Sequence, residues 1–418
     1  MATLGDYISI KHGYAFKGDG ITTEDNGIVL VTPGNFAIGG GFKEGKCKFF
    51  NDEYPSEFVL SPDELIVTMT DLSKEMDTLG YSALVPRSNR VYLHNQRIGL
   101  ISINREDLDK HYLYWFMRTR NYQRTIAGGA SGTTVHHTSP SRICEVEVDF
   151  PDLLTQKKIA SLMDAIEGKI QKNEEVNENL EQQAVLLFRS WFSAFSQSEN
   201  VTRQSSEFGD IPEGFSVVKV GSLKMLITDY VANGSFASLK ENVTLYQEPN
   251  YAYFIRNTDL KSGSFEVFVD QHSYEFLSKS TLYGGEIIIS NVGDVGSVFL
   301  CPKLDGPMTL GNNIIMLRPD DDSLRYYLYI WFKYLQGQAI IQGIKGGSAQ
   351  PKFNKTDFKN TSLLLPPDDL LLRYHDTVSP IFELISQNQA ENKRLSSLRD
   401  ALLPKLMSGE LDVSDIDL

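Results

Sequence analysis

Side chains that could perform catalysis are few in this sequence, and their spacing is wrong for it. His136 and His137 are adjacent, and adjacent side chains of an extended strand point to opposite faces, so they do not share a metal ion. Cys47, Cys144 and Cys301 lie far apart, without zinc-ligand spacing and without a neighbouring histidine. The phosphate loop of ATPases and the Gly-x-Ser-x-Gly turn of hydrolases do not occur. We therefore expect a chain that is not an enzyme and that binds no metal.

The remaining polar side chains suit the recognition of nucleic-acid bases. Base edges are read by Asn, Gln, Ser, Thr, Arg and Lys on exposed loops, and several short segments combine such residues with His or Tyr. The candidates are Lys11, His12, Tyr14, Lys17, Asn95, Gln96, Arg97, Asn257, Ser290, Asn291, Asn312, Asn313 and Gln350. For Asn312 and Asn313 the alternative is that they complete a turn, where asparagine is also common.

A basic, glycine-containing segment that could contact phosphates occurs twice. Residues 118–137 and residues 333–352 each contain three cations, a glycine-containing run and no acidic residue. Glycine lets the backbone approach a phosphate closely, and Lys or Arg supplies the charge. The alternative is an ordinary surface turn after an amphipathic helix. The predicted phosphate contacts are Arg118, Arg120, Arg124, Lys345 and Lys352.

An internal repeat relates these segments and indicates which elements must position them. A shift of 215 residues carries Tyr112 onto Tyr327 without a gap, together with the glycines that follow. Near the start of each half the shift is 216 to 217, and it pairs Asn95 with Asn312. Each repeat opens with short β-like runs separated by turn formers and by short helical patches, which predicts an α+β domain.

The periodicity changes after Pro151. Residues from 153 to 195 contain no proline and only one glycine, which predicts one helix of roughly 60 to 65 Å at 1.5 Å per residue. Alternating steps of four and three residues form a coiled-coil seam, which recurs 215 residues later. Pro404 should kink the second helix or restart it. The predicted helix–helix interface comprises Ile166, Ile170, Asn173, Asn177, Leu180, Ile381, Ile385, Asn388, Asn392 and Leu395.

Both seams carry asparagine at two central layers. Burying an amide costs free energy unless a partner hydrogen-bonds it, and such residues tend to fix the register of a coiled coil. We hypothesise that the helices pack antiparallel about a pseudo-two-fold axis, which brings the four asparagines together. The alternative is that these asparagines face solvent on a loosely amphipathic helix.

Composition along the chain predicts six segments. The segment at 196–213 is rich in Ser, Gln, Glu and Gly and lacks an apolar face, which is typical of a linker, and the acidic residues 412–418 should form a frayed tail. The predicted segments are a first recognition domain at 1–150, a long helix at 151–195, the linker at 196–213, a second recognition domain at 214–366, a second long helix at 367–411 and the tail at 412–418.

Charge and cysteine content limit the kinds of partner. The net charge of −14 disfavours a DNA binder that acts alone, because neutralisation of phosphates by Lys and Arg normally supplies much of the affinity. We therefore expect weak DNA binding by the isolated chain and help from a partner. Three scattered cysteines suit reduced thiols, and no signal peptide or membrane span is evident, so we expect a cytoplasmic protein with no membrane partner.

These features together resemble the specificity subunit of type I restriction-modification systems, over nearly the whole chain. The segments that carry the resemblance are Phe150 to Ile159 with Gln156, the helix end at Leu187, Phe188, Trp191 and Phe192, the module opening at 209–214, and the ending at 398–409. Such subunits often carry Glu then Gln at each helix start. Here Thr155 precedes Gln156, and the second helix has Leu370 and Leu371, so the contacts at the helix starts stay open.

The resemblance implies that each globular half is a target recognition domain for one part of a split, asymmetric site on double-stranded DNA, with the paired helices as a ruler. It also implies two methyltransferase subunits that carry S-adenosylmethionine for DNA methylation, and restriction/translocase subunits, while this chain binds no cofactor. A coiled-coil scaffold with two protein-binding modules is the alternative. The scaffold alternative predicts no salt-dependent binding to DNA, whereas a DNA reader loses affinity for DNA steeply as salt rises.

Overall fold

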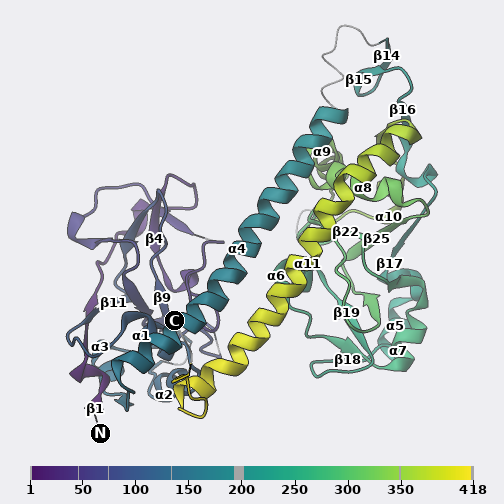
Figure 1. The fold of residues 1–418 in the computed structure, drawn as a ribbon. Coiled ribbons are helices and arrows are strands. Elements are labelled where there is room, and N and C mark those ends of the chain that lie inside the picture. The colour runs from purple at the N-terminus through teal and green to yellow at the C-terminus, as the bar shows by residue number, and fades with distance from the viewer. Residues whose placement is uncertain are drawn as a thin grey trace. The chain divides into compact units, whose positions relative to one another are not determined.

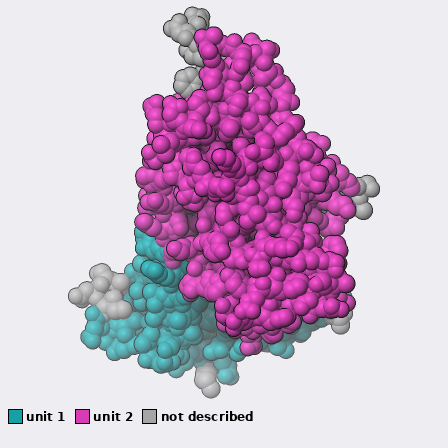
Figure 2. Space-filling model, turned by 90° about the vertical axis from the view of Figure 1, so that its right-hand side faces the viewer, with its two compact units in different colours: residues 1–172, 391–418 teal, residues 173–390 magenta. Residues whose placement is uncertain are grey.

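The chain forms two compact units that each contain one globular domain and part of both long helices. The computed structural model describes residues 2–45, 47–73, 75–132, 134–192, 202–347 and 350–415. Unit 1 comprises residues 1–172 and 391–418, and unit 2 comprises residues 173–390 (Figure 2).

Unit 1 is an α+β domain with two main sheets. An antiparallel sheet has the order β2 (Ile8–His12), β11 (Ile98–Ile103), β7 (Leu65–Thr68), β9 (Ser82–Leu84). A mixed sheet, in which β4 and β10 are parallel, has the order β3 (Ile21–Thr22), β5 (Lys48–Phe50), β4 (Ile28–Val31), β10 (Val91–His94), β6 (Val59–Leu60). Two short pairs are β1 (Ala2–Thr3) with β13 (Glu147–Val148), and β8 (Thr70–Asp71) with β12 (His136–His137). The helices are α1 (Lys110–Phe116), α2 (Arg120–Gly128) and α3 (Pro140–Cys144).

Unit 2 has the same arrangement of sheets. Its antiparallel sheet has the order β17 (Met225–Asp229), β25 (Ile314–Pro319), β22 (Ile287–Ser290), β23 (Val298–Leu300). Its mixed sheet has the order β18 (Leu245–Tyr246), β20 (Phe268–Val269), β19 (Ala252–Ile255), β24 (Met308–Leu310), β21 (Thr281–Leu282), with β19 and β24 parallel. β16 (Ser216–Lys219) pairs with β26 (Ser362–Leu365). The helices are α5 (Phe236–Asn242), α6 (Asn257–Ser262), α7 (Gln271–Phe276), α8 (Arg325–Lys333), α9 (Leu335–Gly343) and α10 (Lys355–Lys359).

The hydrogen bonds of the two units show the register of the repeat. The isolated bridge between Ser131 and His137 recurs 215 residues later between Gly346 and Lys352. Between β11 and β25 the shift is 216, because Ile98 pairs with the last residue of β7, Thr68, and Ile314 pairs with the last residue of β22, Ser290. Asn312 therefore corresponds to Gln96, and the pairing with Asn95 that we predicted is wrong by one residue.

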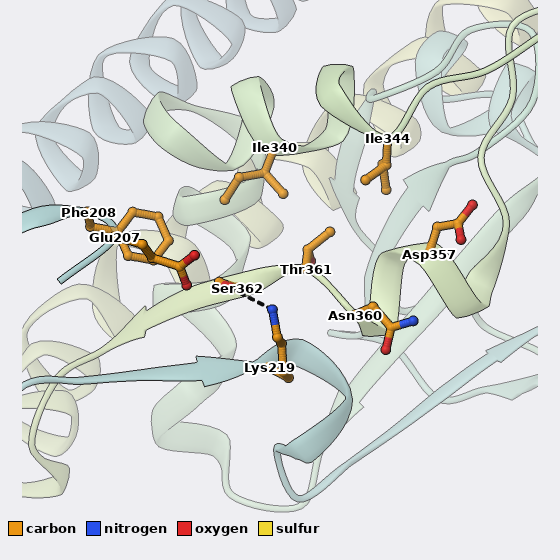
Figure 3. Close-up of a pocket in the computed structure, with 9 residues that line it drawn as sticks. All are labelled: Glu207, Phe208, Lys219, Ile340, Ile344, Asp357, Asn360, Thr361 and Ser362. Carbon is orange, nitrogen blue, oxygen red and sulfur yellow. Dashed lines mark hydrogen bonds between the residues drawn. The ribbon is translucent and has the colours of Figure 1, made fainter.

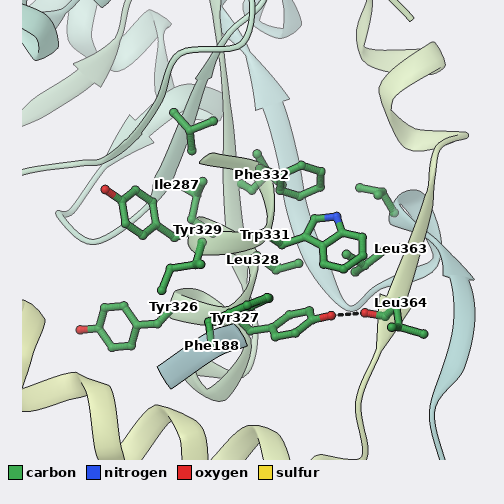
Figure 4. Packing of buried hydrophobic residues seen from close by; sticks show 14 of the residues in the cluster. Phe188, Ile287, Tyr326, Tyr327, Leu328, Tyr329, Trp331, Phe332, Leu363 and Leu364 are labelled. Carbon is green, nitrogen blue, oxygen red and sulfur yellow. Dashed lines mark hydrogen bonds between the residues drawn. The ribbon is translucent and has the colours of Figure 1, made fainter. Parts of the chain in front are cut away.

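One of the two inner strands of each antiparallel sheet, β7 in unit 1 and β22 in unit 2, is buried on both faces, which explains its uninterrupted apolar sequence. In β22, Ile287 and Ile289 face a core that includes α8, whereas Ile288 faces the mixed sheet of unit 2. Figure 4 shows the α8 side chains around Ile287, with the Tyr327 hydroxyl donating to the Leu364 carbonyl. Strand β7 alternates in the same way in unit 1.

The two long helices, α4 (Leu153–Phe192) and α11 (Asp368–Met407), pack antiparallel within each unit (Figure 1). In unit 1, Arg399 Nη1 donates to Glu167 Oε2 at 2.8 Å, and Asn392 Nδ2 donates to the Ile170 carbonyl at 3.2 Å. In unit 2, Asn388 Nδ2 donates to Asn177 Oδ1 at 2.8 Å. Residue numbers rise along α4 as they fall along α11, which confirms the predicted antiparallel pairing.

The seam of predicted interface residues is enclosed to different degrees along its length. Ile166, Ile170 and Asn173 of α4 are buried, and Asn173 has polar contacts with its surroundings. The remaining predicted positions are half-buried: Asn177, Leu180, Ile381, Ile385, Asn388, Asn392 and Leu395. The asparagines that donate in these contacts face the partner helix, so they are not simply solvated.

Three local expectations need correction. α11 continues as one helix through Pro404, so the restart that we allowed for there is wrong, while a kink stays a prediction; Leu403 and Leu406 on either side are both buried in the unit 1 core. The carbonyl that Pro404 leaves without its helical donor belongs to Asp400, whose side chain is exposed. The predicted tail is ordered through residue 415, since Val413 is only 2% exposed and Lys158 Nζ donates to the Ser414 carbonyl at 2.5 Å. Residues 416–418 lie outside the described part.

The predicted linker is the third correction. β14 (Arg203–Ser206) and β15 (Gly209–Pro212) form an antiparallel hairpin. Ile211 is buried in the unit 2 core, and Phe208 packs against Trp331 at 5.9 Å between ring centroids. The apolar residues of this segment are isolated in sequence, so only their packing on unit 2 reveals them. Residues 193–195 of the predicted first helix and 196–201 of the predicted linker lie outside the described residues.

None of the helices in the described part of the chain combines the length and hydrophobicity that crossing a bilayer requires.

Candidate nucleic-acid interface

Candidate residues from two segments, 11–14 and 95–97, meet at one end of the antiparallel sheet of unit 1. His12, the last residue of β2, lies opposite Gly99 of β11. The Tyr14 amide donates to the His94 carbonyl at 2.8 Å, and the Gln96 amide donates to the Tyr14 carbonyl at 2.9 Å. The candidates Lys11, His12, Tyr14, Asn95, Gln96 and Arg97 are therefore neighbours, and all but the half-buried Asn95 are exposed.

Aromatic rings support the cationic side of this cluster. The Lys11 ammonium lies 5.0 Å from the centroid of the Phe58 ring. Tyr14 packs against Phe58 and against Phe16, with centroids 5.3 and 5.1 Å apart. Lys17 is exposed just before the short 3-10 helix at Gly18–Gly20. Packing on the rings limits the motion of Lys11 and Tyr14 at the surface.

His136 and His137 join the same end of the sheet, which our reading of the candidates missed. The Met69 amide donates to the Arg97 carbonyl, and β12 pairs with β8 so that His137 lies opposite Thr70. The Thr70 hydroxyl is 3.1 Å from His137 Nδ1. No group of three possible metal ligands occurs among the described residues. The sequence did contain a signal for His137, because the repeat shift of 215 aligns it with Lys352, which was already a candidate.

Arg118 is not available for a phosphate, and this prediction is wrong. Its side chain is only 7% exposed, Nε donates to the Gly39 carbonyl at 2.9 Å, and Nη1 donates to the Tyr114 hydroxyl at 2.6 Å. The guanidinium also stacks on the Trp115 ring and lies 3.7 Å from Glu167 of α4. These contacts hold α1 against α4 within unit 1.

Lys333, the residue equivalent to Arg118 in unit 2, has the same structural role. Its ammonium lies 2.6 Å from Glu181 of α4 and also donates to the Tyr329 hydroxyl at 2.7 Å. Arg120 and Arg124, by contrast, are exposed one turn apart on α2 and remain candidates for phosphate contact.

The candidates of unit 2 surround the loop between β22 and β23. The Asn291 amide donates to the Asn313 carbonyl at 3.1 Å, and the Gly293 amide donates to the Pro351 carbonyl at 2.9 Å. Val292 forms a bridge with Lys352, which in turn bridges Gly346. This arrangement brings together Asn257, Asn291, Asn312, Asn313, Lys345, Gln350 and Lys352.

Two of these asparagines, Asn313 and Asn291, also have structural roles in unit 2. Asn313 has φ 65°, so it does complete a turn as well as being exposed. Asn291 Nδ2 donates to the Phe353 carbonyl at 3.2 Å, which orients its amide. Asn312, Lys345, Gln350 and Lys352 keep exposed side chains.

Ser290 does not reach the surface, so its assignment as a base reader is wrong. It is 0% exposed and pairs with Ile314 of β25, while its backbone closes the loop through bonds with Ser297 and Gly296. The last strand residue is enclosed on both sides by neighbouring strands. Thr68 of β7 occupies the same buried position in unit 1.

The contacts at the helix starts, which the sequence left open, differ between the units. Gln156 is buried in unit 1, where its amide accepts from the Asp109 backbone at 2.8 Å and donates to the carbonyls of Asp107 and Pro151. These bonds tie the first turn of α4 to the start of α1. Leu371 takes this position in unit 2 and is buried in the apolar core instead.

A shallow hollow lies beside α9 and α10 in unit 2, with a volume of about 500 Å³ (Figure 3). Ile340 and Ile344 line one side, and Lys219 donates to the Ser362 hydroxyl at 3.0 Å on the other. The described residues that line it include neither histidine nor cysteine. A smaller hollow lies beside α2 and α3 in unit 1, and most of its lining corresponds by the shift of 215. The hollow therefore follows from the repeated fold.

Comparison with known proteins agrees with the repeat. The family model for the type I restriction modification DNA specificity domain matches residues 1–182 and 214–395. The type I restriction enzyme MjaIX specificity subunit of Methanocaldococcus jannaschii is 27% identical over 328 residues, which cover 75% of this chain and 72% of that protein. The HindI specificity subunit of Haemophilus influenzae is 25% identical over 353 residues, covering 70% and 75%.

A third relative and a solved structure match along most of the chain. The EcoBI specificity subunit of Escherichia coli is 21% identical over 440 residues, covering 98% of this chain and 85% of that protein. The crystal structure of the type I restriction-modification S subunit from M. genitalium has the same fold, with a TM-score of 0.54, 16% identity, and coverage of 97% and 94%. Because the family model matches both repeats, this chain belongs to the type I restriction modification DNA specificity domain family, as a specificity subunit with two copies of the domain.

Proposed function

We propose that the loop clusters of units 1 and 2 each read one part of a split, asymmetric site on double-stranded DNA. The observation that supports this most directly is that equivalent strand ends present different side chains. Arg97 of unit 1 corresponds to Asn313 of unit 2, and His137 corresponds to Lys352. The same scaffold with different reading groups gives two different half-sites.

The proposed contacts with DNA retain the predicted residues that the fold leaves accessible, at least in part, and add His137. They are Lys11, His12, Tyr14, Lys17, Asn95, Gln96, Arg97, Arg120, Arg124, His137, Asn257, Asn291, Asn312, Asn313, Lys345, Gln350 and Lys352. We assign the target recognition domains to residues 1–150 and 214–366, followed by the long helices at 151–195 and 367–411.

The chemistry belongs to partners in this proposal. Two methyltransferase subunits with S-adenosylmethionine bind the chain and methylate adenines, and restriction/translocase subunits join for cleavage, while this chain binds no cofactor and is not catalytic. Exposed leucines on the helices support a partner surface there, because large apolar side chains in solvent often mark interfaces. They are Leu154, Leu186, Leu372, Leu384 and Leu398. Partners that neutralise phosphates also accommodate the net charge of −14.

The experiment that tests the function measures DNA affinity of the chain with its methyltransferase subunits as salt is raised. A reader of DNA should lose affinity steeply, with log K falling linearly against log salt, and should protect two separated stretches from cleavage. If the complex instead assembles equally well with and without DNA and at every salt concentration, the result would support the protein-binding scaffold. The isolated chain should show the same sequence preference with weaker binding.

A further inference from the structure

The loop between β22 and β23 carries one acidic side chain, Asp294, which is held through a single oxygen. Asp294 Oδ2 accepts hydrogen bonds from Asn257 Nδ2 at 3.2 Å and from Ser297 Oγ at 2.6 Å, and it lies 2.5 Å from the Lys261 ammonium. Among the described residues nothing donates to Oδ1, and the side chain is 43% exposed. The carboxylate is therefore oriented by three donors and keeps one accessible acceptor oxygen.

Asp71 of unit 1 provides a matched comparison, since it also follows an inner strand of its antiparallel sheet. The Ser73 amide donates to Asp71 Oδ1 at 2.6 Å, and the amide and hydroxyl of Thr78 donate to Oδ2 at 2.6 and 2.7 Å. Asp71 is buried, so both oxygens serve the fold of its own loop. Asp294 differs because one oxygen remains for a ligand.

The position of Asp294 lies inside the proposed interface of unit 2. Its loop is bonded to Asn313 and to Pro351, and its partner Asn257 is itself a candidate. A carboxylate at a DNA surface repels phosphates, which the neighbouring Lys261 offsets only in part. A carboxylate that approaches a base edge, however, accepts a hydrogen bond from an amino group.

We propose that Asp294 Oδ1 accepts a hydrogen bond from the exocyclic amino group of one base in the half-site of unit 2. Cytosine and adenine present such a donor in the major groove, whereas guanine and thymine present an oxygen that a carboxylate repels. Asp294 thus selects the amino-bearing base at one position. This inference rests on the proposed function.

The ionisation state of the Asp294 carboxyl group is the one that a hydrogen-bond acceptor requires. Burial raises the pKa of Asp294, but hydrogen bonds from Lys261, Ser297 and Asn257 outweigh it, and the pKa is lower than that of an ordinary aspartate. The side chain is therefore ionised at neutral pH and can only accept.

The test is the sequence that the complete methyltransferase complex methylates in cellular DNA, with the chain present as wild type, Asp294→Asn or Asp294→Ala. In Asp294→Asn the amide oxygen should face the three donors, which turns the amide NH₂ outward. The preference should then invert at one position, from an amino-bearing to an oxygen-bearing base, in one half-site only. Asp294→Ala should relax that position by roughly 10-fold or more.

Asp71→Asn is the control, and it should lower the stability of unit 1 without changing the methylated sequence. The wild-type sequence itself shows whether the selected base is cytosine or adenine. If Asp294→Asn and Asp294→Ala melt like the wild type and methylate the same sequence, Asp294 does not read a base. A wild-type complex that methylates no split sequence would overturn the proposed function itself, which is a distinguishable outcome.

Discussion

At the scale of single residues, His94 lies buried at the end of β10, next to the candidates at 95–97. Burial lowers the pKa of His94 below 6.5, and the positive charges of Lys11 and His12 act in the same direction, while the bond from Nε2 to the Ile98 carbonyl opposes them. Because the folded state disfavours the protonated form of His94 more than the unfolded state does, protonation favours unfolding.

We expect unit 1 to lose stability as pH falls below 6.5 toward the lowered pKa of His94, and to gain nothing from His94 at higher pH. Thermal unfolding at a series of pH values between about 7.5 and 5.5 measures this. His94→Gln keeps a donor for the Ile98 carbonyl and cannot ionise, so its melting temperature should depend less on pH. An unchanged pH dependence in this variant would contradict the assignment.

Arg118 and the pair Arg120 and Arg124 should respond differently to substitution, although the sequence groups them. Arg118→Ala removes a buried network and leaves Glu167 with one cation fewer, so it should cost about 2–3 kcal/mol of unfolding free energy. The double variant Arg120→Ala, Arg124→Ala should change the free energy of unfolding by less than about 0.5 kcal/mol. It should, however, make the slope of log K against log salt shallower by about 2, because two phosphate contacts are lost. Denaturant melts and binding at several salt concentrations separate these effects. Equal effects of both changes on stability would contradict our division.

At the scale of elements, the helices combine a polar register with apolar packing. Asn177 and Asn388 pair in unit 2, and Asn392 bonds the Ile170 carbonyl in unit 1, so a slip of one helix would leave amides without partners. The apolar positions alone would tolerate such a slip, because Ile and Leu fit neighbouring layers almost equally. The asparagines therefore specify how far the helices overlap.

We expect matched insertions in both helices to lengthen the gap in the DNA site. Seven residues added between Ile170 and Asn177, with seven added between Asn388 and Asn392, lengthen each helix by about 10 Å at 1.5 Å per residue, or about three base pairs at 3.4 Å per pair. Sequencing the methylated DNA reports the gap. An unchanged gap in a folded variant would contradict the ruler, and a heptad added to α4 alone should mispair the helices and lower stability.

At the scale of the whole molecule, each compact unit is assembled from distant parts of the chain. The core of unit 1 joins its globular domain to Met163 of α4 and to Leu403, Leu406 and Val413 near the C-terminal end. The core of unit 2 correspondingly includes Phe188 of α4 and Tyr374 of α11, besides its own domain. A recognition domain therefore depends on helix surfaces that the chain supplies from elsewhere.

We expect exchange of one recognition domain to change one half of the methylated sequence only. Replacing residues 1–172 together with 391–418 by the same segments of another specificity subunit keeps the unit 1 core intact. Replacing 1–150 alone leaves foreign contacts with Leu403 and Leu406, so that chimera should melt at a lower temperature. A change in both half-sites would contradict independent reading by the two units.

The sequence by itself determined the repeat, the α+β class of its domains, the two long helices and the family. These features depend on local periodicity and on the recurrence of short segments, which a single chain displays without any tertiary information. The asparagine layers were also visible, because a polar residue at a seam position stands out from the apolar pattern.

Only the tertiary structure decided which polar residues are accessible and what each one contacts. Arg118 is buried while Arg120 is exposed, Ser290 is enclosed by neighbouring strands, and Val413 of the predicted tail lies in a core. Asp71 and Asp294 each follow a short apolar strand within four residues, yet donors occupy both oxygens of one and a single oxygen of the other. Burial and hydrogen bonding arise from segments far apart in the chain, so local sequence patterns do not contain them.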